Sequence, residues 1–391
     1  MASQISAIGW YGGKAKMAKQ IIGLIESTRY TNYVEVFGGG AHVILNKKRD
    51  KLEVYNDINK GLVSLFSVLR DAKRSKELLE QLQLTLYGRD EFNYAKLNWD
   101  KGITAIDDEI IKLQNEYNDK FIDDGKFMIE ITQISDKKNK LKEDLDSGKT
   151  VAEDYHKAIE KLDKKELELK EKLEKSKSGE VRQDYDVKLN ELTGEKDRVQ
   201  IETARMFYIL CQQSFSAGLE SWKSDKSVKS GTLSPAMKRW LNGIEDGLPR
   251  VIERFRSITI ENMSYEYVIE KYDSPDTLFY IDPPYIHDTR GESAREAYMY
   301  EFADGMHVKL VDQLQKIQGK YILSGYNHEI YNPLDNATRF LPETKGVVGE
   351  DKPYAKVKLD DFALSCQRTE KGEKKDFKEE YLWINFVPGS L

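Results

Sequence analysis

Short apolar runs and helical apolar patterns alternate at the two ends of the chain. The runs that predict buried strands are residues 33–36, 51–56, 277–282, 320–325 and 381–386. Apolar residues at helical spacing follow three of these runs, over residues 41–48, 58–73 and 307–317. This strand–helix order predicts an α/β fold in which crossover helices join parallel strands. Such sheets bind ligands beyond the carboxyl ends of their strands, so we expect the chemistry there.

Residues 101–200 have a different pattern. Apolar residues recur there every three or four positions between charged ones, and the segment contains no proline. The series include Ile106, Ile110, Leu113 and Tyr117 before the middle of the segment, and Tyr155, Ile159, Leu162, Leu169 and Leu173 after it. This repeat is typical of coiled coils, and Gly148 suits a turn between arms of roughly 44 and 50 residues. We expect an inserted antiparallel coiled-coil hairpin, which serves either as a solvated structural arm or as an arm for self-association or partner docking.

The charge of the chain is concentrated in this central segment. The 391 residues carry a formal charge of -6, and residues 101–200 contain 21 Lys+Arg against 26 Asp+Glu, which is -5. The rest of the chain therefore carries about -1, so the overall acidity does not argue against a nucleic-acid partner.

Composition excludes several other classes of protein. No run of eighteen apolar residues occurs, so we expect no membrane span, and the first residues do not have the pattern of a secretory signal. Cys211 and Cys366 are the two cysteines, and the five histidines are scattered. Neither set has the spacing of a disulfide framework or a metal site, which favours a cytoplasmic protein without a metal.

A glycine-rich stretch follows the first predicted strand. In YVEVFGGGAHVILN, Gly38, Gly39 and Gly40 would let the backbone approach a ligand closely. Asp57 follows the second strand, where a carboxylate can accept hydrogen bonds from both hydroxyls of a ribose. The stretch lacks a full GxGxxG or a GK[ST] loop, so it fits a nucleoside without a pyrophosphate. A glycine-rich turn without a ligand is the alternative.

A second glycine-containing stretch lies near the N-terminus. The sequence IGWYGGKAKMAKQI, residues 8–21, places Trp10 and Lys14 before a helical pattern. A lysine beside a nucleoside site could hold a carboxylate, although a surface loop would account for the same residues.

The sequence FYIDPPY places an acid and an aromatic ring on either side of two prolines. The Asp282 carboxylate and the Pro283 carbonyl are acceptors, the prolines fix the backbone, and Tyr285 offers a flat face. This combination suits a planar group that bears an NH₂. Acceptance of both hydrogens favours the positive charge that develops when the nitrogen attacks an electrophile. A proline-rich turn with a capping acid is the alternative.

Together these stretches resemble the Dam-like family of DNA adenine-N6 methyltransferases, in its alpha group. The resemblance also covers residues 204–222, 320–334 and 380–386, and two departures from the family pattern are Ala41 and Ser264. It implies S-adenosyl-L-methionine as methyl donor. The implied cofactor residues are Trp10, Lys14, Phe37, Gly38, Gly39, Gly40, Asp57, Ile58, Met263, Ser264, Tyr265 and Asp282. The implied catalytic residues are Asp282, Pro283, Pro284 and Tyr285, which would hold an adenine flipped out of the duplex.

The resemblance also implies a division of the chain. Residues 1–70 and 257–391 would form a Rossmann-like methyltransferase core, and residues 71–100 and 201–256 a helical region that recognises double-stranded DNA. Lys223, Lys226, Lys229, Lys238 and Arg239 are candidate phosphate contacts. A solvated basic surface is the alternative for this cluster. Two other functions stay open from the residues alone: a methyltransferase of RNA or of a protein amide, and a catalytically vestigial binding or assembly protein that acts through its hairpin.

Overall fold

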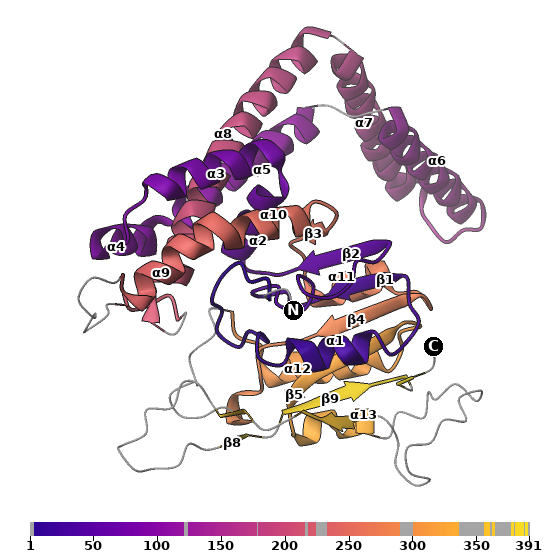
Figure 1. The fold of residues 1–391 in the computed structure, drawn as a ribbon. Helices are drawn as coiled ribbons and strands as arrows, with labels where there is room; N and C mark the ends of the chain where they lie inside the picture. The colour runs from indigo at the N-terminus through magenta and orange to yellow at the C-terminus, as the bar shows by residue number, and fades with distance from the viewer. Residues whose placement is uncertain are drawn as a thin grey trace. The chain divides into compact units, whose positions relative to one another are not determined.

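A mostly parallel sheet forms the centre of the fold (Figure 1). The structure is a computed structural model, and it describes residues 4–120, 124–177, 179–215, 218–223, 233–289, 300–335, 356–359, 362–363, 377–378, 380–386 and 388–389. Within these residues the chain divides into two compact units, Met1–Asp100 with Gln200–Leu391 and Lys101–Val199.

The sheet of the first unit has seven strands among the described residues, in the order β3-β2-β1-β4-β5-β9-β6. The strands are β1 (Asn32–Glu35), β2 (Leu52–Asn56), β3 (Thr259–Glu261), β4 (Thr277–Ile281), β5 (Lys320–Tyr326), β6 (Lys356–Lys358) and β9 (Glu380–Ile384). The five neighbouring strands β3, β2, β1, β4 and β5 are parallel, whereas β9 is antiparallel to both β5 and β6. A separate pair joins β7 (Phe362–Ala363) to β8 (Phe377–Lys378). The five predicted strands and the α/β class are confirmed.

Helices cover both faces of this sheet. The α-helices of the first unit, among the described residues, are α1 (Ala18–Ile25), α2 (Lys60–Arg70), α3 (Ala72–Leu84), α4 (Arg89–Asn98), the last part of α8 (Gly179–Gln213), α9 (Pro235–Asn242), α10 (Leu248–Phe255), α11 (Tyr265–Tyr272), α12 (Asp304–Leu314) and α13 (Asn332–Asp335). Alternate strand residues face opposite sides, because side chains in a strand have a period of two. Tyr33 and Tyr55 belong to the hydrophobic cluster of α1, α2 and α10. Val34 and Phe279 belong to the cluster of α11 and α12.

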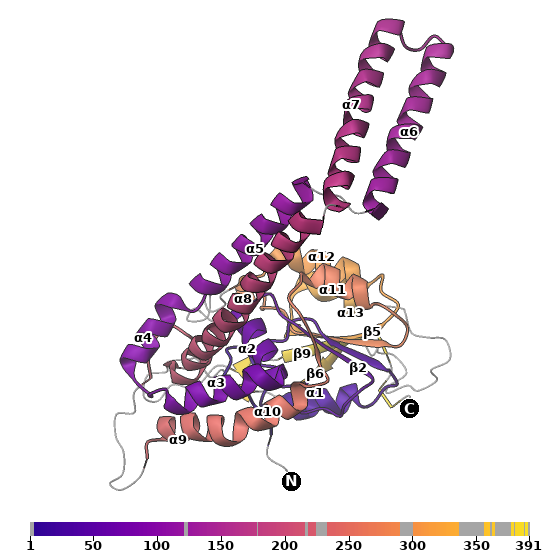
Figure 2. The same cartoon turned by 90° about the horizontal axis from the view of Figure 1, so that it is seen from above.

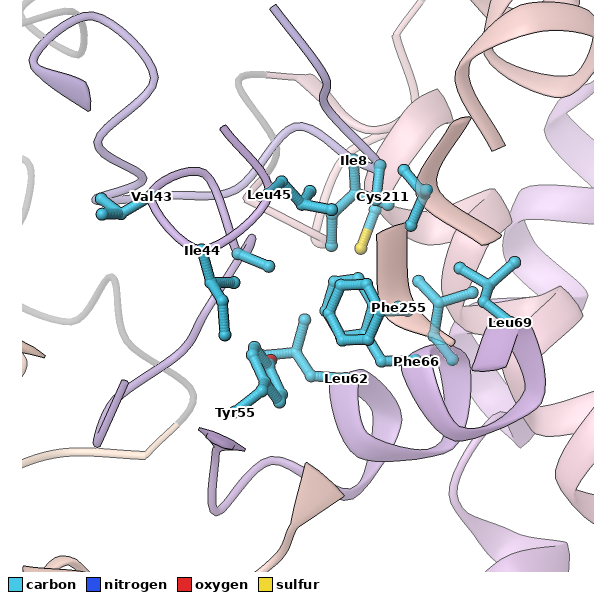
Figure 3. Packing of buried hydrophobic residues seen from close by; sticks show 14 of the residues in the cluster. Ile8, Val43, Ile44, Leu45, Tyr55, Leu62, Phe66, Leu69, Cys211 and Phe255 are labelled. Atoms are coloured by element: carbon cyan, nitrogen blue, oxygen red, sulfur yellow. The ribbon is translucent and has the colours of Figure 1, made fainter. Parts of the chain in front are cut away.

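The first cluster is built around stacked aromatic rings (Figure 3). The rings of Phe66 and Phe255 are parallel with centroids 4.5 Å apart, and the ring of Tyr55 packs on Phe66 at 4.9 Å. Cys211 is buried in the same cluster as a free thiol. This packing fixes α2 and α10 against the strand whose end carries Asp57.

The helix predicted over residues 41–48 is absent, and turns replace it. Leu45 and Lys47 still donate to Ala41 and Val43 as in a helix, but side chains from elsewhere bond other backbone groups of the segment. The carboxylate of Glu35 accepts the N–H of Ile44 at 3.1 Å, and the guanidinium of Arg254 donates to the carbonyl of Ile44 at 2.7 Å. Asn46 bonds the backbone of Ile5. These tertiary hydrogen bonds outweigh the local helical preference of the segment.

The second unit consists of paired helices (Figure 2). They are α5 (Lys101–Lys120), α6 (Asp124–Asp146), α7 (Ala152–Lys177) and the first part of α8 (Gly179–Gln213). α6 and α7 lie side by side on either side of the predicted turn, where Gly148 has φ +71°. Buried Ile134 packs with Leu169, and Lys138 bonds Asp163 and Glu166 across the pair at 2.6 and 2.7 Å.

α5 pairs with α8 in the same antiparallel sense. The rings of Tyr117 and Tyr185 stack with centroids 4.0 Å apart, and Lys196 forms an ion pair with Asp107 at 2.7 Å. The partners in both helix pairs lie at similar distances along the chain on either side of the turn that contains Gly148. Within the described residues, no helix has the length and apolar character needed to cross a bilayer.

Candidate active site

A cavity of about 280 Å³ lies at the carboxyl ends of β1, β2, β3 and β4. Its lining includes every residue that the sequence analysis assigned to the cofactor. These residues come from the N-terminal loop, the loops after β1 and β2, the start of α11 and the segment after β4. The structure therefore brings together three sequence stretches that are far apart along the chain.

The glycine loop after β1 has no space for side chains. A Cβ atom at Gly38 would overlap the ring of Tyr55, and one at Gly40 would lie 2.6 Å from the imidazole of His42. Gly39 has φ +48°, which favours glycine. Ala41 follows with φ 58°, a strained value for a residue with a Cβ. The loop thus presents bare backbone to the cavity.

Asp57 ties this loop to the end of β2. One of its carboxylate oxygens accepts the N–H of Gly39 at 2.8 Å, and the other accepts the N–H of Asn59 at 2.8 Å. Asn59 in turn caps α2 through its side chain. Burial raises the pKa of Asp57 to about 6, although the backbone hydrogen bonds oppose that shift. Each oxygen keeps a further lone pair that can accept from a ligand hydroxyl.

Aromatic side chains form another wall of the cavity. The rings of Phe37 and Tyr265 stack with centroids 5.8 Å apart, and Phe302 packs edge-on against both. Ser264 caps α11, and the N–H of Met263 donates to the side chain of Asn56 at 3.0 Å. These contacts hold residues 263–265 in place as a wall for a flat ligand.

Sequence reasoning missed several residues of this lining: Glu35, His42, Asn56, Tyr300, Phe302 and Met306. Burial, and then the charge of Lys14, lowers the pKa of His42 to about 4, so its imidazole is neutral near pH 7. Burial raises the pKa of Glu35 well above its usual range. The sequence signal for Tyr300 and Phe302 was their aromatic character immediately before the predicted helix 307–317.

Asp282 follows β4 and forms a buried ion pair with Lys14. The ammonium lies 2.7 Å from Oδ1 of Asp282 and 3.3 Å from Oε1 of Glu380, and it donates to the carbonyl of Gly12 at 3.2 Å. Burial raises the pKa of Asp282 to about 6; the charge of Lys14 opposes this shift and that of Glu380 adds to it. The ammonium thus lies among two carboxylates and a backbone carbonyl of the protein itself. The lysine that the sequence suggested as a partner for a ligand carboxylate is therefore already close to two carboxylates of the protein.

Tyr285 also differs from its expected placement. Its side chain is 7% exposed and is not part of the cavity lining, so it does not present an open flat face. The ammonium of Lys14 lies 4.8 Å from the ring centroid, and Tyr326 packs edge-on at 4.6 Å. The hydroxyl donates to Glu380, which holds the ring tip toward β9. Pro283 and Pro284, in contrast, line the cavity as expected.

The candidate DNA contacts are described only in part. Lys238 and Arg239 are exposed on α9, and Lys223 is half-buried, with its backbone N–H donating to Gln213 at 2.8 Å. Lys226 and Lys229 lie outside the described residues, as does Cys366. The neighbouring Trp240 is a core residue, 3% exposed and packed on Tyr208. No group of three or more metal-ligand side chains occurs in the described part of the chain.

Comparison with known proteins supplies the chemistry. A family model described as D12 class N6 adenine-specific DNA methyltransferase matches residues 10–123 and 138–345. A search of curated proteins found no match. The matched residues contain the glycine loop, Asp57 and the Asp-Pro-Pro-Tyr segment, and they end before β9. The match covers most of the chain, which therefore belongs to the D12 class of N6 adenine-specific DNA methyltransferases.

Proposed function

We propose that the cavity binds S-adenosyl-L-methionine and that Asp282 and Pro283 receive the amino group of a target adenine. The observation that carries this proposal is that one cavity is lined both by the glycine loop and by the Asp-Pro-Pro segment. A methyl donor in the first part would lie beside an amine in the second. The enzyme would then be a site-specific DNA adenine-N6 methyltransferase, in keeping with its family.

The residues of the cavity fit this cofactor. The volume of about 280 Å³ lies just below the usual range of ligand pockets, which begins at about 300 Å³. The bare backbone at Gly38, Gly39 and Gly40 allows a ligand to approach closely. Asp57 offers acceptors for ribose hydroxyls, and the neighbouring Ile58 also lines the cavity. The wall formed by residues 263–265 with Phe37 suits an adenine ring. The ring of Trp10 lies against the glycine loop, since a Cβ atom at Gly39 would be 2.9 Å from it. Trp10 would border the methionine end of the cofactor.

The chain would assist the reaction through the target amine. The bound cofactor supplies a methyl group on a positively charged sulfur. The carboxylate of Asp282 and the carbonyl of Pro283 would each accept one hydrogen of the adenine N6 amine, which directs the nitrogen lone pair toward the methyl group. Two prolines keep both acceptors fixed, so no reorganisation is needed as charge develops on the nitrogen. Transfer would be direct, without a covalent enzyme intermediate.

The target base must leave the helical stack to reach Asp282, because the amine is inaccessible in a duplex. We assign residues 71–100 and 201–256 to a DNA-recognition region, and the exposed Lys238 and Arg239 to phosphate contacts. Residues 101–200 would be a coiled-coil insertion, since charged pairs such as Lys138 with Glu166 flank an apolar seam. Its role would be structural, or docking to a partner or a second copy.

The test is transfer of a labelled methyl group to DNA. The purified protein is incubated with labelled S-adenosyl-L-methionine and unmethylated double-stranded DNA, and digested nucleosides are separated. Label in N6-methyladenine is expected, and sequencing for modified adenines would give the recognition site. Transfer to RNA or to protein, with none to DNA, would overturn the proposal. Binding of the donor without any transfer would indicate a vestigial site.

A further inference from the structure

Glu380 is a buried carboxylate beside the candidate active site, and it comes from the C-terminal end of the chain. It is the first residue of β9, which is antiparallel to β5 with Glu380 opposite Tyr326. Its side chain is 10% exposed. It lies in the stretch 380–386 that the family resemblance covers, but beyond the residues that the family model matches, and the resemblance assigns it no role.

A single oxygen of Glu380 collects three donors. Oε1 accepts hydrogen bonds from the hydroxyls of Tyr285 and Ser324, the latter at 2.9 Å, and lies 3.3 Å from the ammonium of Lys14. The hydroxyls of Tyr285 and Ser324 are 3.2 Å apart. The carboxylate thus joins three elements: the N-terminal loop, the segment after β4, and β5.

Stability alone does not explain why a carboxylate is buried at this position. Glu380 and Asp282 are two buried carboxylates that share one ammonium, and buried ion pairs gain little net stability over apolar packing. Glu35, Tyr280 and Tyr331 also lie near Asp282, but burial raises the pKa of each and so favours its neutral form. A carboxylate in this position therefore points to a role in the site.

We propose that Glu380 is a positioning residue for methyl transfer: it fixes the ring of Tyr285 and the ammonium of Lys14, and through them the carboxylate of Asp282. This inference rests on the proposed function. Pro283 and Pro284 fix the backbone, but they leave the tip of the Tyr285 side chain unrestrained. The hydrogen bond to Glu380 restrains that tip, together with the hydroxyl of Ser324, which Glu380 also binds. The negative charge of Glu380 also attracts the ammonium of Lys14, so Asp282 shares this ammonium with a second carboxylate.

Substitutions at Glu380 separate these effects. Glu380→Gln keeps the shape and removes the charge, so kcat should fall by on the order of tenfold to a hundredfold. The acid limb of its kcat–pH profile should also move to lower pH, because the charge of Glu380 raises the pKa of Asp282. Glu380→Asp keeps the charge and shortens the side chain, so kcat should fall while the acid limb stays nearer its original pH. Glu329→Gln, an exposed carboxylate after β5, should change neither quantity.

A double-mutant cycle tests the link to Tyr285. Tyr285→Phe keeps the ring and removes the hydroxyl, and its effect on kcat should be less than additive with that of Glu380→Gln. Thermal melting and the affinity for the methyl donor report whether each variant is folded. If Glu380→Gln does not fold, the two single variants Glu380→Asp and Tyr285→Phe still test the proposal. Two results would overturn the inference, provided that the wild-type protein methylates DNA. One is a Glu380→Gln variant whose kcat and acid limb both equal those of the wild type. The other is a wild-type kcat in both Glu380→Asp and Tyr285→Phe. If the wild-type protein does not methylate DNA, the proposed function itself fails.

Discussion

Lys14 and Asp282 form an ion pair at 2.7 Å in which both side chains are largely buried, at 5% and 14% exposure. One residue belongs to the N-terminal loop and the other to the end of the central strand β4. The pair therefore joins the N-terminal stretch IGWYGGK to the Asp-Pro-Pro-Tyr segment. It also sets the charge on the carboxylate that would receive the target amine.

Replacement of Lys14 by methionine should shift the pH dependence of catalysis upward. The ammonium lowers the pKa of Asp282, so its loss should raise that pKa above about 6 and move the acid limb of the kcat profile to higher pH. The direction is opposite to that expected for Glu380→Gln. Kinetics across the pH range at saturating donor and DNA would measure it, with Lys16→Met, an exposed neighbour, as the control. A weakened donor affinity with an unchanged acid limb would instead show that Lys14 acts on the ligand.

The wild-type protein should lose turnover as the pH falls through about 6. The pKa of Asp282 is raised to about 6, so its carboxylate takes up a proton at pH values where an exposed aspartate is still ionised. The protonated acid is a poorer acceptor for the amine. The pKa of Asp57 is also raised to about 6, so donor affinity should weaken in the same range. Measurement of kcat separately from the donor Kd distinguishes the two groups, and a kcat that stays level down to pH 5 would contradict the assignment of Asp282.

Asp282→Ala should abolish transfer while the donor still binds. Loss of one preorganised hydrogen-bond donor from an oxyanion hole costs about a hundredfold to a thousandfold in rate, and we expect loss of the Asp282 acceptor to cost at least as much. Donor affinity should stay within about tenfold, because the glycine loop and Asp57 remain. Labelled transfer and calorimetry measure these quantities. Asp288→Ala, with a side chain 84% exposed, is the matched control. Near-normal turnover in Asp282→Ala would refute the role.

Local patterns in the sequence predicted the parts of the site that follow strands. Apolar runs such as residues 277–281 gave the strands, and position at a strand end then placed Gly38, Asp57 and Asp282 at one edge of the sheet. Only the order of residues was needed for that inference. The position of the turn at Gly148 was predicted for the same local reason.

Long-range pairing could not be predicted in this way. The contact of Glu380 with Lys14 depends on the antiparallel register of β9 on β5, which no local pattern encodes. The buried ring of Tyr285 depends on the same strands, because its hydroxyl bonds Glu380 of β9 and Tyr326 of β5 packs on the ring. The helix expected over residues 41–48 failed because Glu35 and Arg254 bond its backbone from other elements. Strand β3 has three half-buried residues, too few to give a periodic signal.

Gly38→Ala should damage both folding and donor binding. The new Cβ atom would overlap the ring of Tyr55, which cannot move freely because it packs on Phe66 and donates to the carbonyl of Gly39 at 2.8 Å. Overpacking of this kind typically costs about 1–3 kcal/mol of unfolding free energy. The loop should shift and weaken the hydrogen bond from Gly39 to Asp57, which lowers donor affinity.

Denaturant unfolding and calorimetry would measure these two effects. The control is Gly23→Ala in α1, where no atom lies within 4 Å of the added Cβ. That substitution should be neutral or stabilising by up to about 1 kcal/mol, since alanine is the better helix former. Equal behaviour of the two alanine variants would rule out the close approach seen at Gly38.

Excision of residues 103–198 should leave a folded core that binds the donor. The two ends of the excised segment are adjacent, because a Cβ atom at Gly102 would lie 3.0 Å from the side chain of Val199, so a short glycine linker can join them. The part of α8 that remains supplies Ile201, Ala204 and Phe207 to the main hydrophobic cluster.

The hairpin has its own apolar seam around Ile134 and Leu169, and none of the cavity-lining residues belongs to it. Donor affinity of the excised protein should therefore stay within about tenfold of the full chain, and its thermal unfolding should remain cooperative. Calorimetry and circular dichroism would measure both. Aggregation of the excised protein, or loss of donor binding, would show that the hairpin is an integral part of the core. If the core binds the donor but no longer methylates DNA, the hairpin acts on the substrate or through a partner, whereas full activity would leave it a structural arm.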